Sequence, residues 1–286
     1  MIMKKIYFLS DFHLGAPDAQ SSLKREKLVI DFLEEIRHDA SVIFIVGDMF
    51  DFWYEYRKVV PKGHVRLLGK LAEITDSGIQ VHFFVGNHDM WMNDYFEKEL
   101  NIRTYFEPKS FEFAGRKFLV GHGDGLGPGD RGYKMLKKVF RNPVCQWLFG
   151  IFPPYIGMGL ANYFSRKSRE ATGKHEEVFL GEENEWLVTY SKEVLQHTHY
   201  DYLVFGHRHL PIDISLNGGS RYINLGDWIR YFTYAVFDGQ HLTLHSRYPE
   251  NESKIVRQVS GVYLFFLLVL RRRFLQTPRP TASFIS

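Results

Sequence analysis

Five short apolar runs, each ending in a polar corner marked by a glycine, constrain the fold of this chain more than any other feature. Runs this short, rich in β-branched and aromatic residues, predict buried strands. The five predicted strands are Ile6–Leu9, Val42–Val46, Val81–Val85, Phe118–Val120 and Tyr202–Phe205. Because ligands bind beyond the carboxyl ends of the strands in open α/β sheets, we expect the five corners to converge on one site.

Longer amphipathic stretches separate these runs and predict helices at Leu23–Ile36, Val65–Ile74 and Glu182–Gln196. The alternation of strands and helices is typical of an α/β fold. From Ser215 onward only strands are predicted, with turns such as Asp238-Gly239, so we expect a second, more antiparallel sheet there. These later strands are Ile223–Leu225, Tyr234–Phe237 and Leu242–His245. The predicted architecture is a two-sheet core flanked by helices.

The 286 residues correspond to about two domains of ~150 residues, or to one α/β domain with an insertion. Residues 131–175 interrupt the strand and helix rhythm and predict an inserted helical cap. We therefore expect a core of residues 1–130 and 176–250, the cap at 131–175, and a C-terminal tail at 251–286. The tail is expected to lie at a membrane surface or to be disordered.

Composition excludes several classes of protein. The chain has 36 Lys and Arg against 33 Asp and Glu, and a net charge of +3 does not indicate nucleic-acid binding. The single cysteine, Cys145, excludes an internal disulfide framework and fits a reducing, cytoplasmic compartment. No charge occurs from Asn142 to Ser165, but prolines and glycines in that stretch predict a broken helix pair instead of a membrane span. The nine apolar residues Val262–Leu270 are too short to span a bilayer of ~30 Å, although they can insert at its surface.

The five corners together supply seven candidate metal ligands: Asp11, His13, Asp48, Asn87, His122, His207 and His209. These nitrogen and oxygen donors, with no thiolate, suit Mn²⁺, Fe, Zn²⁺ or Mg²⁺. Seven ligands are too many for one catalytic ion that keeps open positions, but they suffice for two ions if one carboxylate bridges them. Two ions ~3.5–4 Å apart serve phosphoryl chemistry, so the set predicts hydrolysis of a phosphate ester or anhydride.

The five blocks Asp-x-His, Gly-Asp-x-x-Asp, Gly-Asn-His-Asp, Gly-His and Gly-His-x-His follow one another in this order. Together they resemble the calcineurin-like metallophosphoesterases. The resemblance implies an αββα sandwich with a dinuclear metal site, for which we expect Mn²⁺. It implies that one ion is held by Asp11, His13, Asp48 and His209. It implies that the other is held by Asp48, Asn87, His122 and His207, with Asp48 bridging.

The same resemblance assigns roles around the metals. His88 is expected to stabilise or protonate the leaving oxygen, with support from Asp89. Asp51 and Asp89 are expected to orient ligands or the His88 ring instead of binding metal. Asp124 is expected to shape its loop or to cap a helix.

A narrower resemblance is to the UDP-2,3-diacylglucosamine diphosphatases of this family, carried by Ser10–Gly15, Gly47–Trp53, Gly121–Asp124 and Asn224–Trp228. It implies cleavage of a pyrophosphate to UMP and 2,3-diacylglucosamine 1-phosphate in lipid A synthesis. In the third block, however, this chain has His88 where well-studied members have arginine. The alternative is therefore a soluble phosphoesterase that acts on another phosphomonoester or on a nucleotide phosphodiester.

The predicted cap has a composition suited to a lipid. The basic amphipathic stretch Tyr133–Arg141 precedes the uncharged, aromatic Trp147–Phe164, and the basic run Arg166–Arg169 follows. Basic flanks around an apolar hairpin suit an acyl substrate and an anionic membrane, here the cytoplasmic face of the inner membrane. A small core between helices and a solvated basic face are the simpler alternatives. Substrate contacts are expected from Asp130, Arg169 and Lys174.

Overall fold

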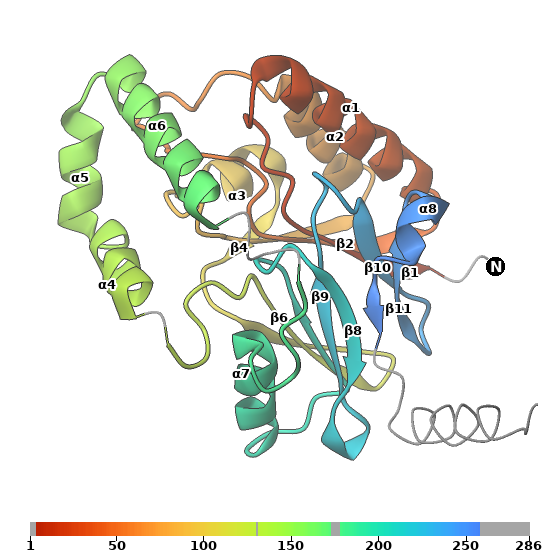
Figure 1. The fold of residues 1–286 in the computed structure, drawn as a ribbon. Helices are drawn as coiled ribbons and strands as arrows, with labels where there is room; N and C mark the ends of the chain where they lie inside the picture. Colours follow the sequence, from red (N-terminus) through yellow and green to blue (C-terminus); the bar gives the residue numbers. More distant parts are fainter. Residues whose placement is uncertain (1–3, 130, 173–177, 258–286) are drawn as a thin grey trace, which may run out of the picture. The chain divides into compact units, whose positions relative to one another are not determined.

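The computed structural model describes residues 4–129, 131–172 and 178–257. The chain divides into two compact units, Met1–Val256 and Arg257–Ser286. The predicted insertion segment Val262–Leu270 lies outside the described residues, as does nearly all of the second unit. The first unit carries two sheets of six strands each (Figure 1).

The first sheet has the strand order β11-β10-β1-β2-β3-β4. Its strands are β1 (Lys5–Leu9), β2 (Ala40–Val46), β3 (Gln80–Phe84), β4 (Arg103–Tyr105), β10 (Thr233–Phe237) and β11 (Leu242–Ser246). Strands β1 to β4 are parallel, with Ile6 opposite Val42. Strand β10 is antiparallel to β1, with Ile6 opposite Phe237. Strand β1 therefore lies in the interior of its sheet.

The second sheet has the order β12-β8-β9-β7-β6-β5. Its strands are β5 (Lys109–Phe113), β6 (Arg116–Gly121), β7 (Tyr202–Phe205), β8 (Pro211–Ser215), β9 (Arg221–Leu225) and β12 (Val256–Arg257). Strands β6, β7 and β9 are parallel. The sequence prediction of a separate sheet from Ser215 onward is wrong, because β10 and β11 return to the first sheet. Strand β10 pairs with β1 across more than 200 residues of chain and β11 pairs with β10, and strand patterns alone do not reveal such long-range pairing.

Alternate residues of each strand pack into different layers. In β1, Tyr7 and Leu9 pack against helices, whereas Ile6 and Phe8 pack between the two sheets. This period of two is what a strand buried on both faces requires. A third cluster lies between the second sheet and α7 (Trp186–Leu195). The layers confirm the predicted αββα sandwich.

Helices α1 (Ala19–Ile36), α2 (Val65–Asp76) and α3 (Tyr95–Leu100) cover the outer face of the first sheet (Figure 1). Helix α1 begins where the Asp18 carboxylate accepts hydrogen bonds of 2.9 Å from the amides of Gln20 and Ser21. The short helix α8 (Pro249–Glu252) precedes β12. These last two elements lie around and beyond residue 250, where the residue pattern predicts neither a helix nor a strand.

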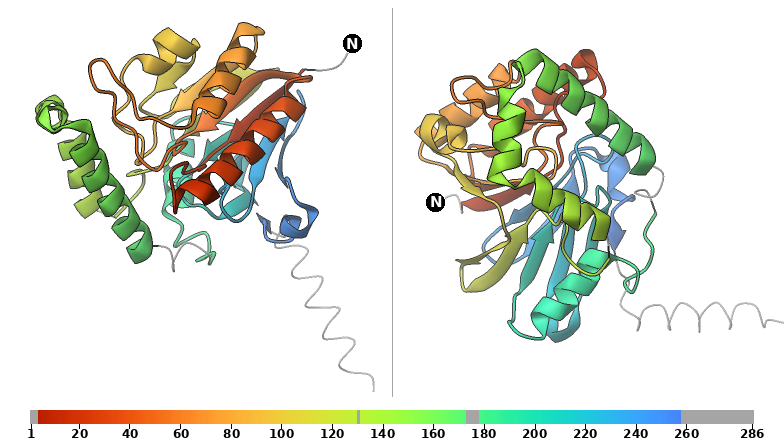
Figure 2. Two further views of the ribbon diagram at one scale, coloured as in Figure 1. Left: turned by 90° about the horizontal axis from the view of Figure 1, so that it is seen from above. Right: turned by 90° about the vertical axis from the view of Figure 1, so that its left-hand side faces the viewer.

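Three consecutive helices occupy the region of the predicted insertion: α4 (Arg131–Phe140), α5 (Pro143–Ile151) and α6 (Pro154–Thr172). Figure 2 shows them side by side along one flank of the sandwich. Among the described residues, no single helix is long and apolar enough to cross a membrane. The stretches Pro143–Ile151 and Pro154–Ser165 reach that length and hydropathy only together, and they are bent by 119°. The predicted broken helix pair is confirmed.

Candidate metal centre

All seven candidate ligands follow the carboxyl ends of strands, and the ends come from both sheets. Asp11 and His13 follow β1, Asp48 follows β2, and Asn87 follows β3. His122 follows β6 in the other sheet, and the last two ligands, His207 and His209, follow β7. The two sheets therefore bring together residues that lie up to 198 positions apart in the chain.

The backbone at this site is strained. Five of the seven ligands have a left-handed backbone, with φ of 57° at Asp11, 45° at His13, 50° at Asp48, 64° at His207 and 56° at His209. Such conformations cost on the order of 1–3 kcal/mol each in a non-glycine residue, and they persist only where the surrounding structure enforces them. Because these strained residues cluster at the corners, the surrounding fold must hold the ligand side chains in place there.

Glycines at two corners permit close approach of other groups. A Cβ on Gly206 would lie 2.0 Å from the Ser10 hydroxyl oxygen and 2.6 Å from Asp11 Oδ2. A Cβ on Gly86 would lie 2.1 Å from Asp48 Oδ1 and 2.6 Å from the Asp48 amide nitrogen. The absence of a side chain at these positions lets the two carboxylates sit directly against the backbone.

The first group of ligands consists of Asp11, His13, Asp48 and His209, whose donor atoms all lie within 4.8 Å of one another. His13 Nε2 lies 3.6 Å from Asp11 Oδ1 and 3.6 Å from Asp48 Oδ2. His209 Nε2 lies 3.1 Å from both His13 Nε2 and Asp11 Oδ1. All of these atoms belong to buried or nearly buried side chains, as a metal site shielded from water requires.

The second group consists of Asp48, His122 and His207. His122 Nε2 lies 3.4 Å from Asp48 Oδ2 and 3.2 Å from Asn87 Oδ1. Asp48 is common to both groups, and its Oδ2 atom faces His13 and His122 at once. The structure thus brings all seven residues together in two groups that have Asp48 in common.

The chemistry of the donor set fits divalent cations. Asp11 Oδ1 and Asp48 Oδ2 are buried and accept no hydrogen bond from the described residues, which is costly unless a cation satisfies them. Burial opposes a charge on His122, but the attraction of the Asp48 carboxylate outweighs it and raises the pKa of His122 to about 10. Burial lowers the pKa of His13 to about 3 and of His207 to about 4, so both rings keep lone pairs for a metal.

An acceptor behind His122 holds its ring with Nε2 toward the centre. His122 Nδ1 lies 2.8 Å from the carbonyl oxygen of Val46. Two other Nδ1 atoms face carboxylates beyond hydrogen-bond distance, His13 at 3.8 Å from Asp51 and His209 at 3.9 Å from Asp227. Such partners fix the tautomer and orientation of metal-binding histidines. Asp51 therefore lies where the sequence places an orienting residue.

Sequence reasoning gave Asp227 no role, although it belongs to a quoted block. Its Oδ1 accepts hydrogen bonds from three successive amides, at Ile229 (3.0 Å), Arg230 (2.7 Å) and Tyr231 (3.1 Å). Its Oδ2 is thereby aimed at the ring of His209. An aspartate directly after a glycine is a turn signal, because its side chain can accept hydrogen bonds from the backbone that follows, and the Gly226-Asp227 pair could have pointed to this role.

Asp89 makes no hydrogen bond or ion pair to the ring of His88 among the described residues, and of the two expected roles its contacts suit the orientation of ligands. Its carboxylate accepts hydrogen bonds from the amides of Met49 (2.8 Å) and Gly86 (2.7 Å). Burial, followed by repulsion from Asp48, raises the pKa of Asp89 to about 7. Asp89 therefore ties together the corners after β2 and β3, and it acts on the backbone that carries the ligands.

His88 lies at the edge of the centre, where its amide donates a 2.9 Å hydrogen bond to Asp48 Oδ1. Its ring crosses the ring of His13 edge-on, with 4.7 Å between the centroids. The ring nitrogen Nδ1 lies 2.9 Å from the carbonyl oxygen of Asp51 and 3.2 Å from the hydroxyl of Ser165 in α6. No sequence signal pointed to Ser165, because its contact depends on how α6 packs.

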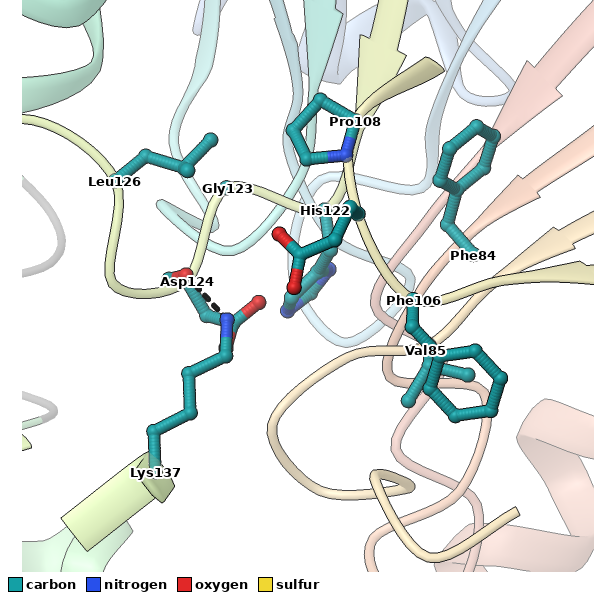
Figure 3. A pocket seen from close by; sticks show the side chains of 10 residues that line it. Phe84, Val85, Phe106, Pro108, His122, Gly123, Asp124, Leu126 and Lys137 are labelled. Carbon is teal, nitrogen blue, oxygen red and sulfur yellow. Dashed lines mark hydrogen bonds and ion pairs between the residues drawn. The ribbon is translucent and has the colours of Figure 1, made fainter. Parts of the chain in front are cut away.

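Asp124 lies in the loop after β6 and attaches α4 to it, so of the two expected roles it fits that of a residue that shapes its loop. Its carboxylate accepts a 2.8 Å hydrogen bond from the Tyr133 hydroxyl and pairs with Lys137 Nζ at 2.5 Å. Figure 3 shows Lys137 reaching Asp124 beside His122, in a small pocket. Asp130 and Lys174 lie outside the described residues, and the structure does not describe the side chain of Arg169.

Comparison with known proteins gives consistent matches. The calcineurin-like phosphoesterase family matches residues 4–211. The chain is 42% identical over 254 residues to a Porphyromonas gingivalis protein named UDP-2,3-diacylglucosamine hydrolase, covering 85% of this chain and 97% of the relative. A protein of the same name from Ectopseudomonas mendocina is 29% identical, covering 82% and 95%. Among solved structures, the phosphoesterase Yfce from E. coli aligns over 87% of this chain and 94% of its own, with 15% identity and a TM-score of 0.42.

Proposed function

The chain belongs to the calcineurin-like phosphoesterase family and is a metal-dependent hydrolase, and we propose that its substrate is UDP-2,3-diacylglucosamine. Hydrolysis of the pyrophosphate bond would release UMP and 2,3-diacylglucosamine 1-phosphate, a step of lipid A biosynthesis. The observation that carries this proposal is the 42% identical relative of that name, which matches the core and the helices of the cap together.

The cap offers the apolar surface that two acyl chains require. Large hydrophobic side chains on α4, α5 and α6 are exposed, and none of the residues of α4 and α5 is buried. They are Met135, Leu136, Val139, Val144, Trp147, Leu148, Ile151, Tyr155, Ile156, Leu160, Tyr163 and Phe164. An apolar surface of this extent is unusual on a protein that meets only water and marks a site for a lipid or a partner. Its position on the helices that contact the metal centre favours the lipid of the substrate.

The metal centre suits the pyrophosphate. We assign Asp11, His13, Asp48 and His209 to one ion and Asp48, Asn87, His122 and His207 to the other, and we propose Mn²⁺, one of the cations that nitrogen and oxygen donors suit, as the metal. Two such cations supply a water of lowered pKa and positive charge beside the phosphate oxygens.

The protein groups around the centre then have separate tasks. His88 presents Nε2 to the leaving oxygen, since its Nδ1 is held by Asp51 and Ser165. Asp89 keeps the corners after β2 and β3 in place through the amides of Met49 and Gly86. Asp130, Arg169 and Lys174 are proposed to bind the sugar and phosphates of the substrate.

We assign the remaining boundaries and the location on the same basis. The core comprises residues 1–130 and 176–250, the cap 131–175, and the tail 251–286. The basic residues of α4, among them Arg131, Lys134 and Lys138, flank the apolar surface and suit an anionic membrane. The protein would therefore act in the cytoplasm, at the cytoplasmic face of the inner membrane.

The experiment uses the purified full chain with Mn²⁺ and UDP-2,3-diacylglucosamine in detergent, and follows the release of UMP. We expect equal amounts of UMP and the sugar-lipid 1-phosphate. Hydrolysis of bis(p-nitrophenyl) phosphate without release of UMP would contradict the substrate and leave the metal centre intact. That outcome would favour the alternative of a soluble phosphoesterase.

Two cap variants test the role of the apolar surface. We expect Trp147→Ser and Tyr155→Ser to lower turnover of the lipid substrate while turnover of bis(p-nitrophenyl) phosphate is unchanged. The matched control is Val65→Ser, because Val65 is also an exposed apolar residue (70% exposed) but lies at the start of α2. Equal losses on both substrates would count against a lipid-binding cap.

A further inference from the structure

Helix α6 reaches the metal centre through one buried serine. Ser165 is 9% exposed, whereas its neighbours Tyr163 and Phe164 are 43% and 60% exposed. The Ser165 hydroxyl oxygen lies 3.0 Å from Asp51 Oδ2 and 3.2 Å from His88 Nδ1. A side chain of the cap thus lies directly against the histidine that faces the leaving oxygen.

The polarity of these hydrogen bonds fixes which nitrogen of His88 carries the proton. A carboxylate only accepts, so the Ser165 hydroxyl donates to Asp51 Oδ2. Its oxygen is then left to accept from His88 Nδ1, and the backbone carbonyl of Asp51, 2.9 Å from the same nitrogen, also only accepts. Both neighbours therefore require an N–H at Nδ1. The other nitrogen, Nε2, makes no hydrogen bond to any described residue and is the atom left for the substrate. Because Nδ1 keeps its proton, Nε2 donates to a leaving oxygen only when the ring carries a second proton, as an imidazolium.

The cap is fastened to the same two segments that carry Asp51 and His88. The Tyr54 hydroxyl donates to the carbonyl of Gln146, and Trp91 Nε1 donates to the carbonyl of Phe140, each at 2.7 Å. The ring of Phe149 packs against Tyr54 and Trp91, with centroids 4.9 Å and 4.6 Å apart. Tyr54 and Trp91 also form a bridge with each other. The position of the cap and the position of the His88 ring are therefore mechanically linked.

We propose that Ser165 is a positioning residue that holds the orientation and tautomer of His88, so that cap helix α6 completes the metal centre. This inference rests on the role of His88 proposed above. It gives the cap a task in the hydrolytic step that is separate from holding acyl chains. The task applies equally to a substrate that has no acyl chain.

The kinetic test compares Ser165→Ala and Ser165→Thr with the wild type on bis(p-nitrophenyl) phosphate and Mn²⁺. Loss of a residue that orients a reacting group costs roughly 10–100-fold, so we expect kcat of Ser165→Ala to fall at least tenfold with KM unchanged. Ser165→Thr keeps the hydroxyl and should recover most of kcat. The matched control is Ser191→Ala, a fully buried helical serine that donates to the carbonyl of Leu187, for which we expect no change in kcat. A raised KM with unchanged kcat in Ser165→Ala would overturn the proposal.

A double-mutant cycle separates this role from simple packing. If Ser165 acts through His88, Ser165→Ala should cause no further loss in a His88→Gln background. The same tenfold loss in that background would overturn the proposal. Use of bis(p-nitrophenyl) phosphate also keeps this test separate from the proposed substrate. If the wild type cleaves this diester but not UDP-2,3-diacylglucosamine, only the proposed substrate is refuted, and the role of Ser165 can still be tested.

A spectroscopic measurement tests the proposed role of Ser165 without relying on turnover. The ¹⁵N shifts of histidine rings distinguish the two tautomers, and they can be recorded on the full chain loaded with diamagnetic Mg²⁺. We expect a protonated Nδ1 at His88 in the wild type, as the Nδ1–H tautomer or the imidazolium, and a mixture of the two neutral tautomers in Ser165→Ala. The Nε2–H tautomer in the wild type would overturn the proposal.

Discussion

Substitution of Gly86 by alanine tests whether the corner after β3 is shaped around the Asp48 carboxylate. The added Cβ would lie 2.1 Å from Asp48 Oδ1 and 2.6 Å from the Asp48 amide nitrogen, and Cβ contacts below 3.0 Å are essentially never observed. One of the two corners must therefore shift by about 1 Å, since part of the obstruction is backbone that no side-chain rotation can relieve. Asp48 is the ligand shared by both groups, so the shift reaches both ions.

The magnitudes follow from the size of that shift. Overpacking of a buried site costs typically 1–3 kcal/mol, so we expect the free energy of unfolding to fall by about that amount and the fold to persist. A misplacement of about 1 Å can cost roughly 100-fold in rate, so we expect kcat to fall by at least that factor. Binding of Mn²⁺, measured by isothermal titration calorimetry, should weaken in parallel.

The control is Gly69→Ala, the same chemical change in the middle of α2. An added Cβ at Gly69 meets none of the described atoms within 4 Å, and alanine favours a helix over glycine by up to about 1 kcal/mol. We expect this variant to be as active as the wild type and slightly more stable. Full activity and unchanged binding of Mn²⁺ in Gly86→Ala would refute the reasoning.

Three further predictions follow from other parts of the site and core. Asp48→Ala should lose at least roughly a thousandfold in kcat while its circular dichroism spectrum is unchanged, and retained turnover would refute the shared role of Asp48. Burial, with a smaller contribution from Arg103, lowers the pKa of His82 to about 4, so its contribution to stability is complete above pH ~6.5 and is lost as the pH falls toward 4. His82→Phe should therefore weaken the dependence of the free energy of unfolding on pH between those values. An unchanged pH dependence, measured by urea titrations at several pH values, would contradict this. Arg208→Met leaves Glu185 buried without the partner that lies 2.9 Å away and should cost about 3–5 kcal/mol, whereas a loss below about 1 kcal/mol would show that the pair is dispensable.

The strands that carry ligands could be predicted from the sequence because each is an uninterrupted apolar run followed by a polar corner. Tyr202–Phe205 coincides with β7, and Val42–Val46 lies within β2. Helix α7 begins at Trp186, four residues after the predicted start at Glu182. Glu185, directly before the helix, points inward and pairs with Arg208. Hydrophobic periodicity does not reveal such an ion pair.

Residues that act through packing could not be predicted. Ser165 lies in a stretch whose hydropathy indicated only an apolar hairpin, and its contact with Asp51 depends on the angle at which α6 leaves α5. Strand β8 begins with Pro211, a residue that weakens any prediction of a strand. It is tolerated because β8 is antiparallel to β9 near one edge of the sheet.

The interior position of β1 has a consequence for biosynthesis. The first two ligands of the chain belong to a strand whose neighbours are β2 and β10, and β10 ends at Phe237. While the protein is being made, Asp11 and His13 leave the ribosome more than 200 residues before β10, so the sheet around them stays incomplete until β10 has followed. Until then, a nascent chain exposes one unpaired edge of β1 beside these two ligands. That edge is a point at which chaperones and neighbouring nascent chains compete with correct folding.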